Sequence, residues 1–253
     1  MNKNIKLLTC NIDNYSPSKH HYLNYKICTD NGIKYTYYTN EYNKYLPKDV
    51  QTIIIINSND YRKEAKKYKV TPSIKNDTTI YAWIDANIKV KKAYLELLNV
   101  MKDDILLFAH DKRDNILSEA EECIRSGKDK KNTLNEQIGR YIALYPEIEK
   151  LGLYQGRIIA RKNNSIVSNF NNMWMDEINN GSIRDQISLP VALDRAKLKK
   201  NVITNDYNKY FAVVPHSKYK MYGQVEKKKY YLSYIKYKIN KTIYQIKNVT
   251  DNA

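Results

Sequence analysis

The segment Thr79–Val90 (TIYAWIDANIKV) decides the expected fold, because it joins an apolar strand to a polar turn. Such an apolar strand is typical of the buried centre of a sheet. Asp85 and Asn87 follow it two residues apart, so in an extended chain their oxygen-bearing side chains point to the same side. Oxygen ligands at this spacing suit a hard divalent cation, Mn²⁺ or Mg²⁺, that also binds a diphosphate. The simpler alternative is an Asx turn that only closes the strand.

The segments before it alternate between strands and helical stretches. Ile5–Ile12, Ile33–Thr39 and Thr52–Ile56 have strand composition, and the last is too uniformly apolar to be expected at the surface. Tyr61–Val70 is expected to form a helix that ends before Pro72, since the residue before a proline is pushed out of helical geometry. The alternation predicts an α/β fold, with a Rossmann-like mixed sheet flanked by helices in a single domain.

The later segments are mainly helical in pattern. Apolar residues at helical spacing predict an amphipathic helix over Ser165–Asn179. The S/T-x-x-E sequences Ser118–Glu121 and Thr133–Glu136 are capping boxes, and each predicts the start of a helix. A further helix is expected within Ile183–Leu198, and a short strand at Phe211–Val214.

A Lys/Tyr-rich composition begins at Gln224. We therefore divide the chain into a main domain, residues 1–220, and a basic extension, residues 221–253. Contact with an anionic surface is expected of this extension.

The formal net charge of +16 indicates a polyanionic partner: nucleic acid, an anionic membrane surface or the diphosphate of a nucleotide. An A/T-rich genome would also enrich Lys, Asn, Ile and Tyr. Three cysteines without metal-ligand spacing favour buried free thiols in a reducing compartment. No stretch approaches the roughly 20 apolar residues that span a bilayer. We expect a soluble cytoplasmic protein, in the host cytoplasm if the chain is viral.

Several motifs follow one another in an order that resembles a known family. A basic helix with a terminal proline, Tyr61–Pro72, precedes the Trp83–Ile88 strand and turn, and a His-x-x-Arg-Asp stretch lies in Phe108–Asp114. An Arg-bearing strand, a Trp-bearing helix and an Arg-Asp-Gln triplet follow: Gly156–Arg161, the helix around Trp174, and Arg184–Gln186. From about Tyr35 to Leu193 the chain resembles the glycosyltransferase-like domain family also found in plant mucilage-related proteins. YAWIDANI resembles the metal-binding D-x-D element of GT-A glycosyltransferases, which implies a GT-A-like fold.

The resemblance implies a metal site and a donor site. Asp85 would be the main metal ligand, Asn87 a weaker neutral one, and His216 would complete the site, although a lone His is more often structural. Donor phosphates would be bound beside Asp85 by a basic stripe on the preceding helix, which could instead be a solvated face: Arg62, Lys66 and Lys69. His20 and His21 are expected at the surface.

The resemblance also implies an acceptor side. Four ionisable residues, His110, Asp111, Arg113 and Asp114, would lie beside the acceptor with Arg184 and Gln186. Asp185 would be the general base, with Asp111 as the second candidate. Simpler alternatives are that Asp114 caps a helix and that Asp185 is stabilised by a helix dipole.

We therefore predict a metal-dependent glycosyltransferase. It would move a sugar from a UDP- or GDP-linked nucleotide-sugar donor to a glycan, glycoprotein or other hydroxyl acceptor. A basic nucleic-acid-binding protein is one alternative, although no helix-turn-helix, zinc, RRM or KH pattern is present. A metal-dependent nuclease or phosphatase is another, which would hold its ions with carboxylates. Its candidate ligands are Asp85, Asp111, Asp114 and Asp185.

Overall fold

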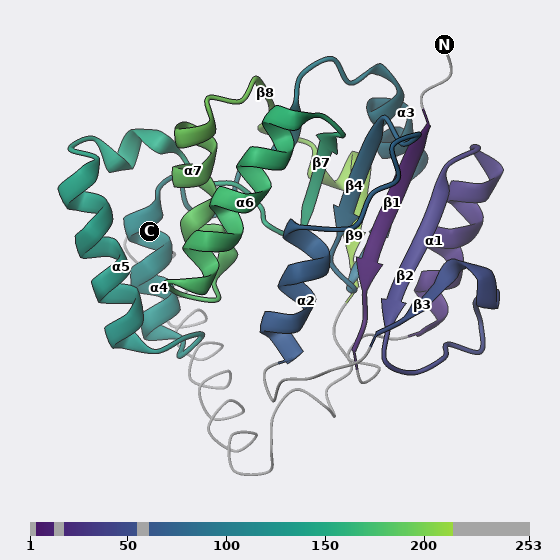
Figure 1. The fold of residues 1–253 in the computed structure, drawn as a ribbon, viewed down its shortest axis with the longest axis horizontal. Coiled ribbons are helices and arrows are strands. Elements are labelled where there is room, and N and C mark those ends of the chain that lie inside the picture. The colour runs from purple at the N-terminus through teal and green to yellow at the C-terminus, as the bar shows by residue number, and fades with distance from the viewer. Residues whose placement is uncertain (1–3, 13–17, 55–60, 215–253) are drawn as a thin grey trace, which may run out of the picture. The chain divides into compact units, whose positions relative to one another are not determined.

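The computed structural model describes residues 4–12, 18–54 and 61–214, and these belong to one compact unit (Figure 1). His216 and the basic extension lie outside the described residues, so their expected roles stay predictions. The strands are β1 Ile5–Cys10, β2 Lys34–Thr39, β3 Gln51–Ile53, β4 Ile80–Ile84, β5 Ile88–Val90, β6 Ile105–Phe108, β7 Ile158–Lys162, β8 Lys200–Ile203 and β9 Phe211–Val213. The α-helices are α1 Ser18–Asp30, α2 Tyr61–Val70, α3 Lys92–Val100, α4 Ile116–Arg125, α5 Lys131–Leu144, α6 Ser165–Asn179, α7 Asp185–Ala196 and α8 Tyr207–Tyr210. Short 3-10 helices cover Lys48–Val50 and Ile148–Leu151.

Within these residues the main sheet has seven strands in the order β3-β2-β1-β4-β7-β6-β8. β7 is antiparallel to both of its neighbours, whereas the other pairings are parallel, so the sheet is mixed. Strands β5 and β9 form a separate antiparallel pair. The predicted α/β fold, a mixed sheet flanked by helices, is confirmed.

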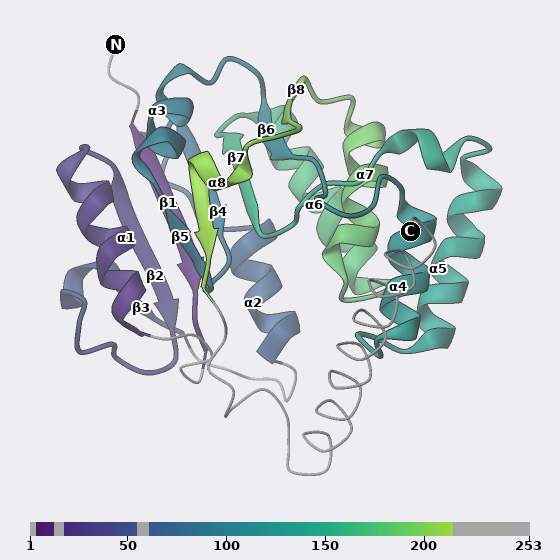
Figure 2. The same ribbon diagram turned by 180° about the vertical axis from the view of Figure 1, so that it is seen from behind.

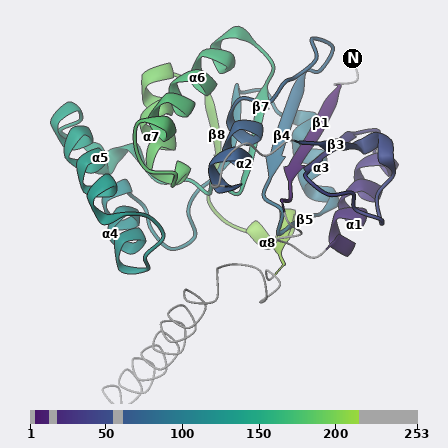
Figure 3. The ribbon, with the colours of Figure 1, turned by 60° about the horizontal axis from the view of Figure 1, so that its bottom comes forward.

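Alternation of side chains along the strands creates two apolar faces. Ile5 and Leu7 of β1 lie in a core shared with α1 and α3, whereas Leu8 and Cys10 lie in a core shared with α2, α6 and α7. Figure 1 looks onto the side that carries α2, α6 and α7, and Figure 2 shows α1, α3, β5 and β9 from behind. A third core packs α4 and α5 against α7, and Figure 3 shows this pair at the far side of α7 from the sheet.

Several local predictions are confirmed. Helices α2 and α6 have the predicted bounds, and β1, β2 and β9 match the predicted strands to within a few residues. Phe170 and Trp174 of α6 are fully buried and stack on each other. All three cysteines are free and buried, as predicted.

Other local predictions are wrong or hold only in part. Ile54 is buried as expected, but Ile53 is 42% exposed, because β3 is an edge strand that pairs with β2 alone among the described strands. Residues 55 and 56 of the predicted strand lie outside the described residues. The two capping boxes do not begin helices: α4 begins after Asn115, whose side chain accepts a hydrogen bond from the Ser118 backbone, and α5 has no side-chain cap. His20 and His21 are buried rather than at the surface, since α1 packs against the turn after β4.

Arg161 of β7 fixes α2 against the sheet. Its guanidinium is fully buried and donates to the last carbonyls of α2, Lys69 and Val70, and to Asn171 Oδ1 at 2.6 Å. Cations are stabilised at the carboxyl end of a helix, where four carbonyls have no partner within the helix. Arg161 therefore positions the helix that carries the predicted donor-binding lysines.

Replacement of Arg161 by Met should lower the free energy of unfolding by about 3 kcal/mol, since buried acceptors on α2 and Asn171 would lose their charged donor. Denaturant unfolding measures the change. Arg140→Met is the matched control, because the Arg140 side chain is 43% exposed in its ion pair with Glu177. Equal losses for both variants would contradict the assigned role.

Candidate active site

The candidate site lies at the edge of the sheet where β4 and β6 end and β7 begins. The backbone N–H of Asp85, just after β4, donates to the Arg157 carbonyl at 2.8 Å. Similar bonds join the end of β6 to the segment before β7: Gln155 N–H donates to Phe108 at 2.7 Å, and His110 N–H donates to Leu153 at 2.9 Å. Ligand sites of open α/β sheets lie at such strand ends.

Two carboxylates and two lysines form what we call the carboxylate–lysine cluster: Asp85, Asp185, Lys66 and Lys69. Lys66 Nζ lies 2.7 Å from Asp185 Oδ1, and Lys69 Nζ lies 2.5 Å from Asp185 Oδ2. Lys69 Nζ also lies 3.6 Å from Asp85 Oδ1. The two lysines are three residues apart on α2 and thus share one helix face. The structure thus brings together Asp85 and Asp185, which are 100 residues apart in the sequence.

The environment of Asp185 keeps its carboxylate charged. Asp185 is 4% exposed, and burial alone would raise its pKa. The two ammonium groups outweigh burial and hold the pKa of Asp185 well below its usual range. Burial is the largest influence on Lys66 and lowers its pKa. A carboxylate with a strongly lowered pKa and two cationic partners is a weak proton acceptor near neutral pH.

Asp85 is more open to solvent. Its side chain is 39% exposed, and its Oδ1 accepts a hydrogen bond of 2.7 Å from the Trp83 indole. Helix α1 holds the turn that follows: His20 Nε2 donates to the Ala86 carbonyl, and Asn24 Nδ2 donates to the Ile88 carbonyl at 2.7 Å. The Asp85 carboxylate is therefore fixed in direction and still reachable by a ligand.

A divalent cation held at this turn would take Asp85 and Asn87 as its protein ligands. Asp85 and Asn87 offer oxygen ligands, and Mg²⁺ in proteins is commonly held by one or two carboxylates together with substrate phosphates and water. Among residues 4–12, 18–54 and 61–214, no three His, Cys, Asp or Glu side chains group together as metal ligands. A cation at this turn would therefore need further ligands from a bound molecule or from water. The nuclease alternative gains no support, because it needs several carboxylates around its ions.

Arg62, the third basic residue of the expected stripe, lies apart from the cluster. It is exposed, and its guanidinium lies 3.5 Å from the Lys128 carbonyl, in the loop after α4. Lys66 and Lys69 face Asp185 instead. The three residues therefore do not form the single stripe that was expected: Arg62 faces solvent, whereas Lys66 and Lys69 pair with Asp185.

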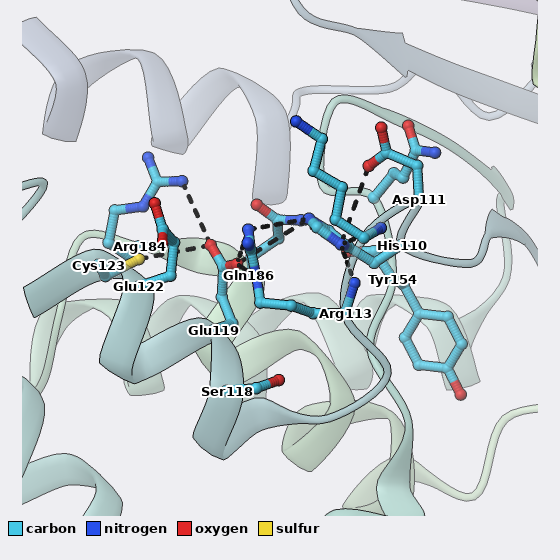
Figure 4. A network of polar contacts seen from close by, with 12 residues as sticks. His110, Asp111, Arg113, Ser118, Glu119, Glu122, Cys123, Tyr154, Arg184 and Gln186 are labelled. Carbon is cyan, nitrogen blue, oxygen red and sulfur yellow. Dashed lines mark hydrogen bonds and ion pairs between the residues drawn. The ribbon is translucent and has the colours of Figure 1, made fainter. Parts of the chain in front are cut away.

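Three of the six residues expected at the acceptor side, His110, Arg113 and Arg184, surround Glu119 of α4 in what we call the Glu119 cluster. Glu119 Oε2 accepts from Arg113 Nε at 2.6 Å and lies 3.9 Å from His110 Nε2. Its Oε1 lies 3.9 Å from Arg184, and Figure 4 shows Arg184 and Arg113 approaching from opposite sides. Glu119 has no exposed surface, so this carboxylate neutralises cations brought from two loops.

His110 is neutral in this arrangement. Its Nδ1 accepts from the backbone N–H groups of Lys112 and Arg113, and burial lowers its pKa. Gln186 donates to the Tyr154 carbonyl at 3.0 Å. Asp114 is exposed and accepts from the side chain of Asn115, which is the residue that caps α4.

Asp111 points away from the Glu119 cluster. Its side chain is 36% exposed, and Oδ1 lies 3.8 Å from the guanidinium of Arg157. Figure 4 shows its carboxylate on the side of His110 opposite to Glu119. Asp111 is thus an accessible carboxylate at the end of β6, with one cationic neighbour across the strand ends.

Glu119 and Gly156 are functional candidates that the sequence analysis missed. Glu119 lies three residues after Ile116 and four before Cys123, both buried, so helical spacing could have placed it on the inner face of α4. A Cβ added to Gly156 would lie 3.4 Å from Lys69 Nζ and 3.5 Å from Asp185 Oδ2. No sequence signal reveals this close approach of the backbone to the ion pair.

The fold and the charged sheet edge define an α/β protein with a polar site at its strand ends. The chain belongs to the TOD1/MUCI70 glycosyltransferase-like domain family, whose model matches residues 32–220. This confirms the family expected from the motif order. No curated protein matches the chain significantly.

Two solved glycosyltransferases have a similar arrangement. One is involved in the glycosylation of the major capsid of PBCV-1, with 8% identity, 79% of this chain and 82% of that chain covered, and a TM-score of 0.47. The other is the galactosyltransferase LgtC in complex with donor and acceptor sugar analogs, with 8% identity, 79% and 73% covered, and a TM-score of 0.41. Neither likeness bears on the activity or the ligands of this chain. No helix in the described part of the chain is long and apolar enough to cross a bilayer.

Proposed function

We propose that this chain transfers a sugar from a UDP- or GDP-linked donor to a hydroxyl of a glycan or glycoprotein, with Mn²⁺ or Mg²⁺ as cofactor. One observation carries the proposal: the partly exposed carboxylate of Asp85 lies at a strand end, 3.6 Å from a buried lysine of α2. Such a pair can face a cation and the phosphates that the cation binds. Family membership supports the same class of reaction.

Different residues of the chain have different proposed roles at the donor. Asp85 and Asn87 would hold the cation, which would supply positive charge that stabilises the departing diphosphate. Lys66, whose side chain is 18% exposed, donates to the phosphates, and Lys69 fixes the direction of the Asp85 carboxylate. Arg62, which lies apart from the cluster, stays only a predicted donor contact. A cation at this turn needs no other carboxylate than Asp85 if phosphate oxygens complete its shell.

We assign the proton acceptor to Asp111 rather than to Asp185, because Asp111 is accessible and Asp185 is buried between two ammonium groups. The acceptor oxygen bonds to the anomeric carbon while the bond from that carbon to the diphosphate oxygen breaks. The hydroxyl proton passes to Asp111, and the nucleoside diphosphate leaves with the bonding electrons. Asp185 keeps both lysines in place.

The Glu119 cluster supports the proposed site through the loop between β6 and α4. His110 and Arg113 fix the loop that carries Asp111, since both interact with Glu119. Arg184, Gln186 and Asp114 remain proposed contacts of the acceptor, because all three retain exposed surface.

Thermal unfolding with nucleotides tests the donor class. UDP or GDP with Mn²⁺, at about 100 times its Kd, should raise the Tm by about 5–10 °C, because a ligand that binds only the native state stabilises it. The rise should disappear with EDTA. Stabilisation that is equal with and without the cation would contradict a cation-bridged donor site, and no stabilisation by either nucleotide would contradict the donor class.

A further inference from the structure

A cavity of about 450 Å³ lies beside the candidate site, on the side of β9 and α8. Its lining includes Asp111, Gln155, Arg157, Asp206, Tyr207 and Phe211. The backbone of Arg157 contacts Asp85, and β9 pairs with β5 directly after the Asp85–Asn87 turn. The cavity therefore adjoins the proposed donor site.

Gln155, which lines the cavity, carries a side-chain acceptor without a partner. Gln155 is 2% exposed, and its Nε2 donates to the Ala109 carbonyl at 3.2 Å, which fixes the orientation of the amide. Its buried Oε1 has no hydrogen-bond partner among the described residues. A buried acceptor without a partner costs free energy that a ligand donor would recover.

Gly156 separates the cavity from the carboxylate–lysine cluster. Its neighbours Gln155 and Arg157 line the cavity, whereas a Cβ at Gly156 itself would point at Lys69 and Asp185. Gly156 and Arg157 form a turn just before β7. One short segment therefore contacts the donor side with one residue and the cavity with the two residues beside it.

The lining suits a polyhydroxylated ring. Asp111, Asp206 and Gln155 Oε1 accept hydrogen bonds, as hydroxyl donors require, and Arg157 supplies donors. The rings of Tyr207 and Phe211 add apolar surface, so the lining combines apolar walls with a few polar groups, as ligand pockets usually do. Burial, and to a lesser extent the Asp111 carboxylate, raises the pKa of the Tyr207 hydroxyl.

We propose that this cavity binds a sugar ring of the acceptor, with Gln155 Oε1 and Asp206 accepting from its hydroxyls. The inference rests on the proposed function and adds the acceptor subsite to it. The hydroxyl that reacts would then lie toward Asp111, which lines the cavity.

Saturation-transfer NMR on the full chain tests the subsite, with the methyl glycosides of glucose, galactose, mannose, xylose and rhamnose as probes. Spectra are recorded both without nucleotide and with saturating UDP or GDP and Mn²⁺. At least one glycoside should receive saturation, and Gln155→Met should weaken its binding about 3- to 10-fold, as expected for one lost hydrogen bond. Asp206→Asn should weaken it to a similar extent. Asp206 has a left-handed φ of 52°, which Asn also tolerates, so this variant removes charge without backbone strain.

The control is Asp194→Asn, on the exposed surface at the end of α7, which should leave glycoside binding unchanged. Nucleotide binding is measured on each variant and should be unaffected. If no glycoside binds while nucleotides do, or if the cavity variants bind it as well as the control does, the subsite is wrong. Displacement of the glycoside by nucleotide alone would also overturn it, since the cavity would then belong to the donor. If the unaltered chain binds neither UDP nor GDP, the proposed function itself is contradicted.

Discussion

Asp85→Asn is expected to lower kcat/KM about 10²- to 10³-fold, the usual cost of removing one group that stabilises charge in a transition state. The amide can still accept from the Trp83 indole, so the turn should keep its shape. The substitution removes the negative charge that faces Lys69 and the proposed cation. The nucleotide should therefore bind equally well with and without Mn²⁺ in this variant.

Asp77→Asn is the matched control, because Asp77 lies before β4 at the opposite end of the strand and its side chain is 54% exposed. It should leave both turnover and cation-dependent binding unchanged. Calorimetric titration of UDP and GDP with and without Mn²⁺, together with initial rates, separates the effects. If Asp85→Asn keeps its cation dependence, the cation does not bind at this turn.

Strand β4, which directly precedes Asp85, and helix α2, which carries Lys69, were predictable because short sequence patterns indicate them. An uninterrupted apolar run identifies β4, and Pro72 limits α2. The Asp85–Asn87 turn could therefore be recognised as a candidate ligand site from its residues and their spacing alone. The family resemblance then extended the predicted site from this turn to the motifs that follow it along the chain.

The pairing of Asp185 with α2 was not predictable from the sequence. Lys66 and Lys69 look like part of a solvated stripe, because local spacing shows which residues share a helix face but not what that face contacts. Burial of Lys69 and Asp185 results from packing of α2 against α6 and the start of α7, which are more than ninety residues away in the chain. For this reason we propose that Asp185 is an ion-pair partner of the two lysines rather than the proton acceptor.

Asp185→Asn is therefore expected to destabilise the fold by about 3 kcal/mol, since it leaves two ammonium groups, one of them buried, facing a neutral amide. For a domain of this size the Tm should fall by about 6–12 °C. Asp194 lies on the same helix as Asp185 and forms an exposed ion pair with Lys197. Asp194→Asn should lower the free energy of unfolding by less than about 1 kcal/mol. Denaturant unfolding of both variants gives the comparison.

The pH dependence separates this role from general-base catalysis. The folded pKa of Asp185 lies below the unfolded value of about 3.9, so its stabilising contribution is complete above pH 4 and is lost as the pH falls through the folded pKa. The difference in unfolding free energy between the unaltered chain and Asp185→Asn should be constant from pH 5 to 8 and shrink below about pH 4. A general base would instead give a pH–rate profile with an inflection near neutrality. If Asp185→Asn removes such an inflection and leaves stability unchanged, Asp185 is the proton acceptor and the assignment to Asp111 fails.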